Sequence, residues 1–431
     1  MAVILEGIKE KIIRGTITIP GDKSITHRAI ILGSIAEGET IIQNYLDGLD
    51  CQNTISCMQS LGVLVERVKK NLLIVKGRGL SGLQAPNGVL QVGNSGTTIR
   101  LLAGLLCGQN FNSVLDGDYS IRKRPMKRVI QPLSLMNAQI KGLYQSDFAP
   151  LSIVGKSLQG IHYTLPVASA QVKSALLLAG LYANGETVIY EPEITRDHTE
   201  RMLELMQADI KYLPGDKISL KPGKILKGVL IDVPGDISSA AYFLALACAR
   251  KESEIIVKNV GINPTRTGFL KVLKQMGAQI SLLNQKDISQ EPRADIKING
   301  ALLRGISIDK KIIPSIIDEL PLVAVIATQA QGETVIKDAQ ELRVKESDRI
   351  KSIVQGLTKM GAHIYEREDG FTVTGPNQLQ GNIVESYYDH RIAMSLVIAA
   401  SYATGKTVLQ QEECINISYP NFLKTYFQLS T

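Results

Sequence analysis

The chain of 431 residues contains no tryptophan, and aromatic residues make up only 5% of it. Proteins that bind nucleic acid usually combine a basic stripe with stacking aromatic side chains. Here the formal charge is +7, but lysine and arginine are scattered apart from one short basic run within residues 122–128. We therefore expect no nucleic-acid partner, and the excess of cations favours a small polyanionic ligand instead.

Cysteine and long apolar runs are also scarce. The five cysteines form no Cys-x-x-Cys pair and no metal-ligand spacing with the five histidines, so we expect reduced thiols and no metal site. No apolar run reaches the roughly 18 residues that span a bilayer. The first six residues lack the basic start of a signal peptide. These absences predict a cytoplasmic protein with no membrane segment.

Nucleotide-binding motifs are missing as well. Residues 77–82 spell Gly-x-Gly-x-x-Gly after an apolar strand, but the next residues include Pro86 and Gly88 and do not predict a helix. A dinucleotide site requires a helix at that point. The phosphate-binding pattern Gly-x₄-Gly-Lys-Ser/Thr does not occur either. The sequence therefore gives no sign of a nucleotide cofactor.

The chain does contain a sixfold repeat. An apolar helix that ends near a small residue, followed by a strand, recurs along its whole length, and a second helix and strand lie between successive copies. Each unit is predicted to run strand, helix, strand, helix, strand, strand. The marker residues at the helix ends are 66 to 81 residues apart: Gly38, Gly108, Gly185, Lys251, Gly332 and Gly405.

The starts of the repeated helices carry an unusual charge pattern. They open on polar or glycine residues, as N-caps do, and we expect Ser24 or Thr26 to cap the first. Several have cations near the first turn, where the helix dipole favours acidic residues. This pattern predicts helix N-termini that converge on anionic ligands. The cations are Lys23, Arg28, Arg100, Lys173 and Arg391.

A long-range match divides the repeats into two groups. Residues 19–24, Ile-Pro-Gly-Asp-Lys-Ser, are echoed by residues 233–238, Val-Pro-Gly-Asp-Ile-Ser, about half a chain later. We predict two domains of three units each, which close around a ligand and so assemble the site. The predicted domains are residues 1–20 plus 234–431 and residues 21–233, with a hinge at Pro20-Gly21 and Pro234-Gly235.

Residues 341–349 hold the densest cluster of charge. Three basic and three acidic side chains lie within these nine residues, which we expect to begin a helix that runs through Leu357. Such a cluster is also typical of ion pairs on a solvated helix start. Asp318 and Glu319 open the preceding repeated helix. Together the two segments offer the separated carboxylates that paired acid and base catalysis needs.

Several motifs together resemble one family. They occur in order through essentially the whole chain: residues 21–24 (Gly-Asp-Lys-Ser) with Arg28, residues 93–97 (Gly-Asn-Ser-Gly-Thr), residues 124–126 (Arg-Pro-Met), residues 343–349 (Arg-Val-Lys-Glu-Ser-Asp-Arg) and residues 389–391 (Asp-His-Arg). The pattern is similar to that of the 5-enolpyruvylshikimate-3-phosphate (EPSP) synthases. The resemblance implies the enolpyruvyl transferase fold, an α/β (α+β) fold of six βαβαββ units, three per domain, arranged as an inside-out α/β barrel.

The resemblance also implies substrates and roles. The substrates would be shikimate 3-phosphate and phosphoenolpyruvate, with no metal or organic cofactor, and the protein would be a monomer. Asp318 would take the proton of the sugar-ring 5-hydroxyl, and Glu346, with Lys23 nearby, would protonate C3 of phosphoenolpyruvate. Shikimate 3-phosphate would be held by Lys23, Ser24, Arg28, Ser169, Gln171, Arg196, Asp318 and Lys345. Phosphoenolpyruvate would be held by Lys23, Asn94, Gly96, Arg124, Gln171, Arg349 and Arg391.

Two other functions stay open at this point. UDP-N-acetylglucosamine enolpyruvyl transferase shares the fold but usually carries a cysteine in the loop before its Arg-Pro pair, and residues 118–124 contain none. A non-catalytic anion-binding scaffold would explain the cations but gives Asp318 and Glu346 no purpose. Within the EPSP synthases, Ala170 and residues 195–198 are more similar to the divergent second class. Residues 417–420 lack the lysine that many members carry there.

Overall fold

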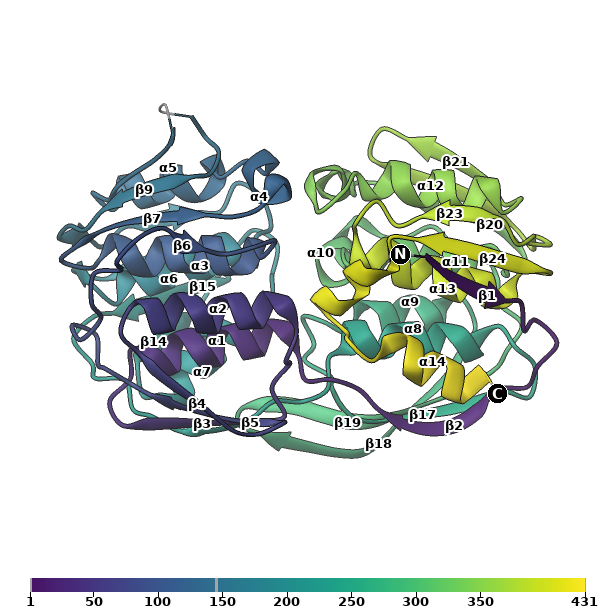
Figure 1. Ribbon diagram of the computed structural model, residues 1–431, viewed down its shortest axis with the longest axis horizontal. Helices are drawn as coiled ribbons and strands as arrows, with labels where there is room; N and C mark the ends of the chain where they lie inside the picture. Colours follow the sequence, from purple (N-terminus) through teal and green to yellow (C-terminus); the bar gives the residue numbers. More distant parts are fainter. Residues whose placement is uncertain (1, 144–145, 431) are drawn as a thin grey trace. The chain divides into compact units, whose positions relative to one another are not determined.

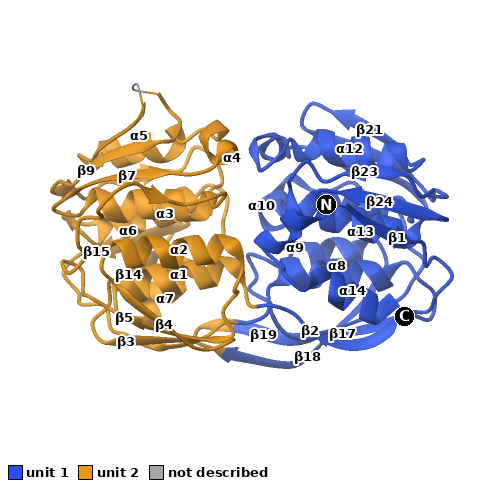
Figure 2. Cartoon of the chain, in the orientation of Figure 1, with its two compact units in different colours: residues 1–20, 234–287, 292–431 blue, residues 21–233, 288–291 orange. Residues whose placement is uncertain are grey.

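The computed structural model describes residues 2–143 and 146–430. The chain forms two compact units (Figure 2). It passes from one unit to the other between Pro20 and Gly21, between Val233 and Pro234, and on either side of residues 288–291. The predicted division kept all of residues 234–431 in one domain, whereas these four residues belong to the other unit. The hinge stays a prediction. Unit 1 comprises Met1–Pro20, Pro234–Asp287 and Pro292–Thr431, and unit 2 comprises Gly21–Val233 and Ile288–Glu291.

Unit 2 contains three four-stranded sheets among its described residues, and all three share one topology. The first two strands of each sheet are parallel, and the remaining neighbours are antiparallel. A short parallel pair, β10 (Leu158–Gln159) with β12 (Ala183–Asn184), lies beside them in sequence. The sheets are β16 (Leu230–Asp232), β3 (Glu39–Gln43), β5 (Leu72–Lys76) and β4 (Leu64–Lys69); β6 (Leu90–Gln91), β7 (Asn112–Asp116), β9 (Leu151–Val154) and β8 (Gln139–Gly142); and β11 (His162–Thr164), β13 (Thr187–Tyr190), β15 (Lys217–Lys221) and β14 (Asp209–Leu213).

The described residues of unit 1 form one four-stranded and two three-stranded sheets, which include strands from both ends of the chain. The N-terminal strand β1 (Ala2–Glu6) pairs antiparallel with β24 (Lys406–Gln410), and β2 (Arg14–Thr18) pairs parallel with β17 (Glu254–Gly261). The first residues of the chain thus complete two sheets of unit 1. The other strands of unit 1 are β18 (Gln279–Ile288) and β19 (Glu291–Asn299) beside β17; β20 (Gly332–Ile336), β22 (Gly370–Gly375) and β21 (His363–Arg367); and β23 (Ile383–Glu385) beside β24.

Within each unit the apolar helices lie inside, and the sheets lie outside them (Figure 1). Every residue of α8 (Ile237–Cys248), α11 (Leu320–Ala327) and α13 (His390–Tyr402) is buried. A helix that is apolar all round must lie within a core. None of the sheets closes into a barrel within the described ranges. The inner helices of unit 2 are α1 (Lys23–Ser34), α3 (Gly96–Cys107) and α6 (Ala170–Gly180).

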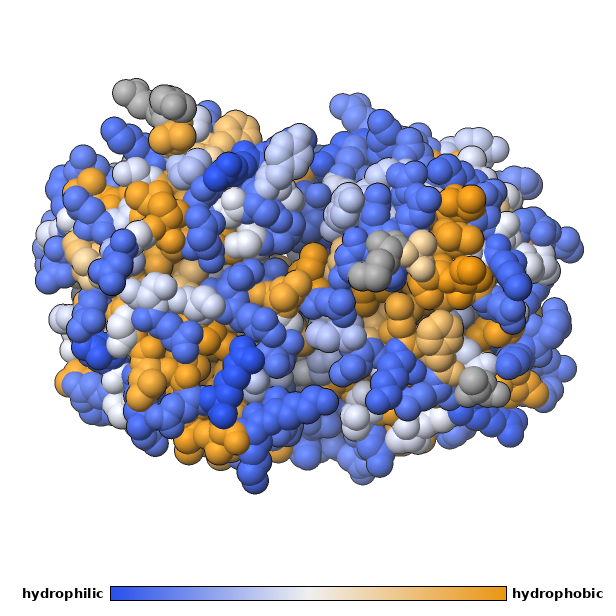
Figure 3. Space-filling model, viewed as in Figure 1, coloured by the Kyte–Doolittle hydropathy of each residue, from blue (hydrophilic) through white to orange (hydrophobic). Residues whose placement is uncertain are grey.

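A second set of helices buries only one face. These helices carry apolar residues at helical spacing on that face and polar residues on the other. No described helix is both long and apolar enough to cross a membrane. On the face that Figure 3 shows, hydrophilic and apolar side chains are intermixed over each unit. The second set comprises α2 (Leu49–Ser60), α5 (Lys127–Leu135), α7 (His198–Leu205), α9 (Gly268–Gln275) and α12 (Arg349–Lys359); shorter or terminal helices are α4 (Tyr119–Lys123), α10 (Ile313–Ile316) and α14 (Phe422–Ser430).

The inner helices other than α11 begin at capping side chains. Asp22, rather than Ser24 or Thr26, caps α1, because its Oδ1 accepts a hydrogen bond from the Ile25 amide at 2.9 Å. Thr26 instead donates its hydroxyl to the Asp22 carbonyl. An aspartate is the better cap here, since its charge also suits the positive end of the helix dipole. The side-chain caps of the inner helices are Asp22, Ser95, Ser169, Asp236 and Asp389.

Helices α3 and α6 pack closely at Gly104. A Cβ atom at this position would lie 2.1 Å from the carbonyl oxygen of Ala175, which is far inside van der Waals contact. The obstacle is the backbone of α6, which cannot rotate away as a side chain would. Glycine at position 104 therefore sets how near the two helices approach.

We expect Gly104→Ala to lower the free energy of unfolding by about 1–3 kcal/mol, because the added methyl group overpacks the α3–α6 contact. The better helix propensity of alanine offsets only part of this loss. Gly88→Ala is the matched control, since a Cβ at Gly88 would meet nothing within 4 Å. Urea denaturation of both variants measures the difference, and equal midpoints would contradict the packing argument.

Candidate active site

Arg349, the first residue of α12, lies at the centre of a charged cluster in unit 1. Its guanidinium contacts three carboxylates: Nε lies 2.8 Å from Asp389, Nη1 lies 3.1 Å from Asp318, and Nη2 lies 2.6 Å from Glu346. The arginine side chain is only 2% exposed. Burial alone would lower the pKa of Arg349, but the three carboxylates outweigh it and raise that pKa. The guanidinium is therefore a fixed cation that holds three acids around it.

Asp318 lies among three cations from two segments of unit 1. Besides its contact with Arg349, its Oδ1 lies 3.9 Å from Lys345 Nζ and its Oδ2 lies 3.9 Å from Arg391 Nη2. The Asp318 side chain remains 15% exposed, and that of Glu346 16%. Asp318 and Glu346, unlike the buried Asp389, thus keep an open surface beside buried cations, which is the arrangement that proton transfer to a bound ligand requires.

Arg391, at the start of α13, joins this cluster to α8. Its Nη1 lies 3.5 Å from Glu319 Oε1, and the same carboxylate accepts a hydrogen bond from the Ser238 hydroxyl. Burial opposes the charge of Arg391, but the nearby carboxylates of Asp318 and Glu319 raise its pKa well above the ordinary value. Burial also raises the pKa of Tyr242 to about 12, so its phenol stays neutral.

The segment 341–349 does not form the expected continuous helix. A 3₁₀ turn covers Gln340–Val344, the chain is extended at Lys345, and α12 begins at Arg349 with Asp348 as its N-cap. The Asp348 carboxylate accepts a hydrogen bond from the Lys351 amide at 3.0 Å and so fixes the start of the helix at Arg349. Glu346 consequently precedes the helix and reaches back to Arg349.

Arg28 is the counterpart of Arg349 in unit 2, but its partners are neutral. Its guanidinium donates to the Thr199 hydroxyl at 2.6 Å, to the Ser174 hydroxyl at 2.8 Å and to the Ser24 carbonyl at 2.9 Å. Burial lowers the pKa of Arg28 to about 10. A buried guanidinium bonded to neutral oxygens favours an added anion, which would offset the cost of burying the charge.

Arg124, Asn94 and Gly96 meet at the start of α3. Arg124 Nη2 donates to Asn94 Oδ1 at 2.8 Å, and a Cβ at Gly96 would lie 2.9 Å from Arg124 Nη1. Gln171, in the first turn of α6, donates to the Thr97 hydroxyl at 3.0 Å and accepts from Arg100 at 2.9 Å. The starts of α3 and α6 are thus linked by hydrogen bonds between polar side chains.

The remaining predicted residues of unit 2 lie near these two groups. Lys23 Nζ lies 2.8 Å from the Asp50 carboxylate, and the lysine side chain is 15% exposed. Ser169 caps α6. Arg196 precedes α7 and acts electrostatically on Arg28. Whether one ligand site includes residues of both units stays a prediction.

Lys173 does not belong with the cations that we expected to face an anion. Its side chain is 1% exposed, and its Nζ lies 2.7 Å from Glu191 and 2.6 Å from Glu200. Burial opposes the charge of Lys173, but Glu200 and Glu191 raise its pKa. A helix-start lysine points inward here because two buried glutamates neutralise it. Sequence position alone does not reveal these partners.

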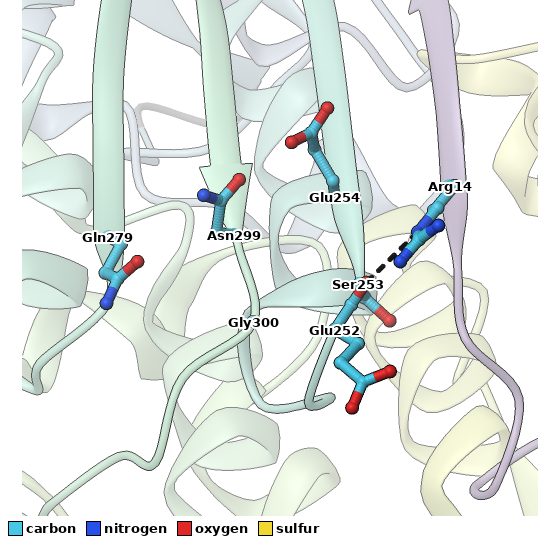
Figure 4. A pocket seen from close by; sticks show the side chains of 7 residues that line it. All are labelled: Arg14, Glu252, Ser253, Glu254, Gln279, Asn299 and Gly300. Carbon is cyan, nitrogen blue, oxygen red and sulfur yellow. Dashed lines mark hydrogen bonds between the residues drawn. The ribbon is translucent and has the colours of Figure 1, made fainter.

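A further pocket in unit 1, of about 410 Å³, lies apart from the predicted residues (Figure 4). Its side chains come from β2, β17, β18, β19 and the turn before β17, and Arg14 Nε donates to the Glu252 carbonyl across one side of it at 3.2 Å. The described residues contain no group of three or more potential metal ligands. The lining residues are Arg14, Glu252, Ser253, Glu254, Gln279, Asn299 and Gly300.

His27 lies on α1 between the site cations Lys23 and Arg28. It is fully buried, and its Nδ1 lies 2.7 Å from the Thr54 hydroxyl. Burial, with Lys23 and Arg28 adding to it, holds the pKa of His27 well below its usual value of 6.5. His27 therefore binds a proton near pH 6.5 in the unfolded chain but stays neutral at that pH in the folded chain. The free energy of unfolding consequently falls as the pH drops below 6.5.

We expect His27→Gln to remove this acid-dependent loss. Below pH 6.5, the wild type should lose up to about 1.4 kcal/mol of unfolding free energy per pH unit relative to the variant. Urea denaturation between pH 7.5 and 5.5 measures it. His162→Gln, at an exposed histidine on β11, is the control. Parallel stability curves for wild type and His27→Gln would contradict the assignment.

Comparison with solved structures identifies the fold first. The enolpyruvyl transferase NikO from Streptomyces tendae matches with a TM-score of 0.80 over 99% of this chain and 96% of that chain, at 15% sequence identity. That likeness shows the fold alone. Together with the cation-rich helix starts, it defines an enolpyruvyl transferase fold and confirms the predicted two-domain α/β architecture.

The family follows from closer relatives. The family model for EPSP synthase (3-phosphoshikimate 1-carboxyvinyltransferase) matches residues 8–426. A 3-phosphoshikimate 1-carboxyvinyltransferase from Thermoanaerobacter sp. (strain X514) is 52% identical, covering 99% of this chain and all of that protein, and one from Bacillus cytotoxicus is 51% identical over 96% and 97%. The EPSP synthase of Acinetobacter baumannii is 44% identical with a TM-score of 0.87, over 99% of this chain and 98% of that chain. The chain belongs to the EPSP synthase family, as its motifs predicted.

Proposed function

We propose that this chain transfers the enolpyruvyl group of phosphoenolpyruvate to the 5-hydroxyl of shikimate 3-phosphate and releases phosphate. The observation that carries the proposal is the cluster around Arg349, which places Asp318 and Glu346 on one guanidinium with Arg391 beside them. Family membership supports this function over a non-catalytic scaffold and over UDP-N-acetylglucosamine as acceptor.

Shikimate 3-phosphate binds mainly to unit 2 in this proposal. Its phosphate and carboxylate need cations that are not already bonded to carboxylates, and the hydroxyl-bonded Arg28 meets that need. Arg196 adds a second cation near Arg28. The full set of residues for this substrate is Lys23, Ser24, Arg28, Ser169, Gln171 and Arg196, with Asp318 and Lys345 from unit 1.

Phosphoenolpyruvate takes cations from both units in this proposal. Arg124 is held by Asn94 next to Gly96, where the absence of a side chain leaves the guanidinium room. Arg349 and Arg391 provide positive charge that burial and their carboxylate neighbours fix in place. The full set for this substrate is Lys23, Asn94, Gly96, Arg124, Gln171, Arg349 and Arg391.

The proposed reaction is an addition followed by an elimination, and Asp318 and Glu346 transfer the protons in both steps. Asp318 accepts the proton of the 5-hydroxyl while its oxygen bonds to C2 of phosphoenolpyruvate, and Glu346 donates a proton to C3, which gives a tetrahedral adduct. The bond from C2 to the phosphate oxygen then breaks, Glu346 takes a proton back from C3, and phosphate leaves with the proton that Asp318 received. Positive charge from Lys23, Arg349 and Arg391 stabilises the charge that develops. Neither a metal nor an organic cofactor enters these steps, and we propose a cytoplasmic monomer.

The test of this function is phosphate release from phosphoenolpyruvate, measured with purified protein and no added metal. One reaction contains shikimate 3-phosphate and the other contains UDP-N-acetylglucosamine. We expect release only with shikimate 3-phosphate. Release only with the sugar nucleotide would assign the chain to the alternative transferase, and no release with either acceptor would favour the scaffold.

We expect Glu346→Gln to bind both substrates and to lose a factor of about 10² to 10⁴ in kcat, because an amide cannot deliver a proton to C3. The matched control is Glu333→Gln, at an exposed glutamate on β20 of the same unit. Steady-state kinetics with calorimetric binding separate the two effects. A rate equal to that of wild type would remove Glu346 from the proton-donor role.

A further inference from the structure

The tip of the β18–β19 hairpin belongs to a different unit from its strands. Residues 279–287 and 292–299 are part of unit 1, but the tip, Ile288–Glu291, is part of unit 2. These are two long strands, which join through this short turn (Figure 1). The four residues of this turn thus belong to unit 2, although the strands that they join belong to a sheet of unit 1.

The two central residues of the tip adopt a backbone conformation that favours glycine. Ser289 has φ 54° and Gln290 has φ 60°. Two successive positive φ values are typical of a type I′ hairpin turn, in which Asn-Gly is preferred because a Cβ atom disfavours this region. A strained backbone of this kind persists only where contacts with the surrounding structure hold it, often at functional sites. At this tip, the side chains of both residues contact unit 2.

Ser289 and Gln290 anchor the tip to α7 and β16. The Ser289 hydroxyl accepts from the Asp232 amide at 3.1 Å. The Gln290 carbonyl accepts from Arg201 Nη1 at 2.9 Å, and its side-chain amide, in the orientation that satisfies its neighbours, donates to Glu204 at 3.2 Å. A turn of Asn-Gly would form the hairpin equally well but would lose the contacts of both side chains.

Glu291 makes the most buried contact of the tip. Its carboxylate lies 2.7 Å from His198 Nδ1, and the two side chains are 6% and 2% exposed. His198 Nε2 is buried and has no hydrogen-bond partner within the described part of the chain. The bond to Glu291 therefore fixes the orientation of the imidazole ring. Glu291 also acts electrostatically on Arg28 and Arg201.

His198 lies between Arg196, a residue of the proposed substrate site, and Thr199, which holds another such residue, Arg28. It is the first residue of α7, and Arg196 lies two positions earlier. Thr199, the next residue, accepts the hydrogen bond from Arg28 Nε at 2.6 Å. A side chain that fixes His198 thus fixes the start of α7, and with it the backbone that presents Arg196 and the hydroxyl that orients Arg28.

We propose that Glu291, at the tip of the β18–β19 hairpin, is a positioning residue that acts through His198 on Arg196 and Arg28 and so sets the affinity for the phosphate-bearing acceptor. This inference rests on the proposed function. It assigns a role in acceptor binding to a residue that lies outside the family motifs of the sequence. It also gives a reason for two non-glycine residues in a turn that favours glycine.

The first test is Glu291→Ala, compared with Glu291→Gln. We expect Glu291→Ala to raise the KM for shikimate 3-phosphate by roughly 10-fold, with kcat and the KM for phosphoenolpyruvate changed less than about 2-fold, because only the acceptor contacts lose their support. Glu291→Gln should recover most of the affinity, since its amide oxygen still accepts from His198. The matched control is Glu254→Ala, which removes an ion pair with Lys297 elsewhere in the same sheet.

The second test keeps the hairpin and removes the side-chain anchors of the turn. The double variant S289N/Q290G has the preferred residues for this turn, so we expect it to fold at least as stably as wild type. Its KM for shikimate 3-phosphate should nevertheless rise several-fold. This variant also serves if Glu291→Ala fails to fold.

Specific outcomes would overturn the inference. An unchanged KM for shikimate 3-phosphate in folded Glu291→Ala or in S289N/Q290G would contradict it, and so would an equal loss in kcat and in both KM values. Wild-type turnover in the same assay tests the proposed function separately. An active wild type with unaffected variants refutes only the positioning role, whereas a wild type inactive with shikimate 3-phosphate refutes the function itself.

Discussion

The contact of one buried guanidinium with three carboxylates is the interaction on which unit 1 depends. Arg349 joins Asp318, Glu346 and Asp389, which come from three separate segments of the chain. Removing one member of such a buried cluster leaves an uncompensated charge and typically costs about 3–5 kcal/mol. The contact therefore fixes the start of α12 and, with it, the two partly exposed carboxylates that the proposed reaction uses.

The two units handle buried positive charge in different ways, and this difference suits the proposed substrates. In unit 1, Arg349 and Arg391 are neutralised by acids, among them the two to which we assign the proposed proton transfers. In unit 2, Arg28 donates hydrogen bonds to hydroxyl and carbonyl oxygens, which are neutral. Its positive charge can therefore pair with a bound anion. Two polyanions repel each other in water, and preorganised cations with water excluded would offset that repulsion.

Much of the fold and of the candidate site could be predicted because they depend on local pattern. The sixfold repeat, the inner helices and the family motifs are visible in the order of residues. Partners that meet only after folding could not be predicted: Asp389 as a buried partner of Arg349, Glu191 and Glu200 around Lys173, and the tip at residues 288–291. Such contacts join residues distant in sequence, and hydrophobic periodicity carries no information about them.

The most direct test of the central claim, that carboxylates in unit 1 move protons to and from C3, is the reaction in D₂O. Mass spectrometry of the product at partial conversion measures deuterium in the enolpyruvyl methylene group. Glu346 is partly exposed and exchanges with solvent, so C3 should gain a deuteron in the adduct and lose one of its three hydrogens afterwards. We predict deuterium in that group. A product free of deuterium would contradict the addition and elimination that the site is proposed to catalyse.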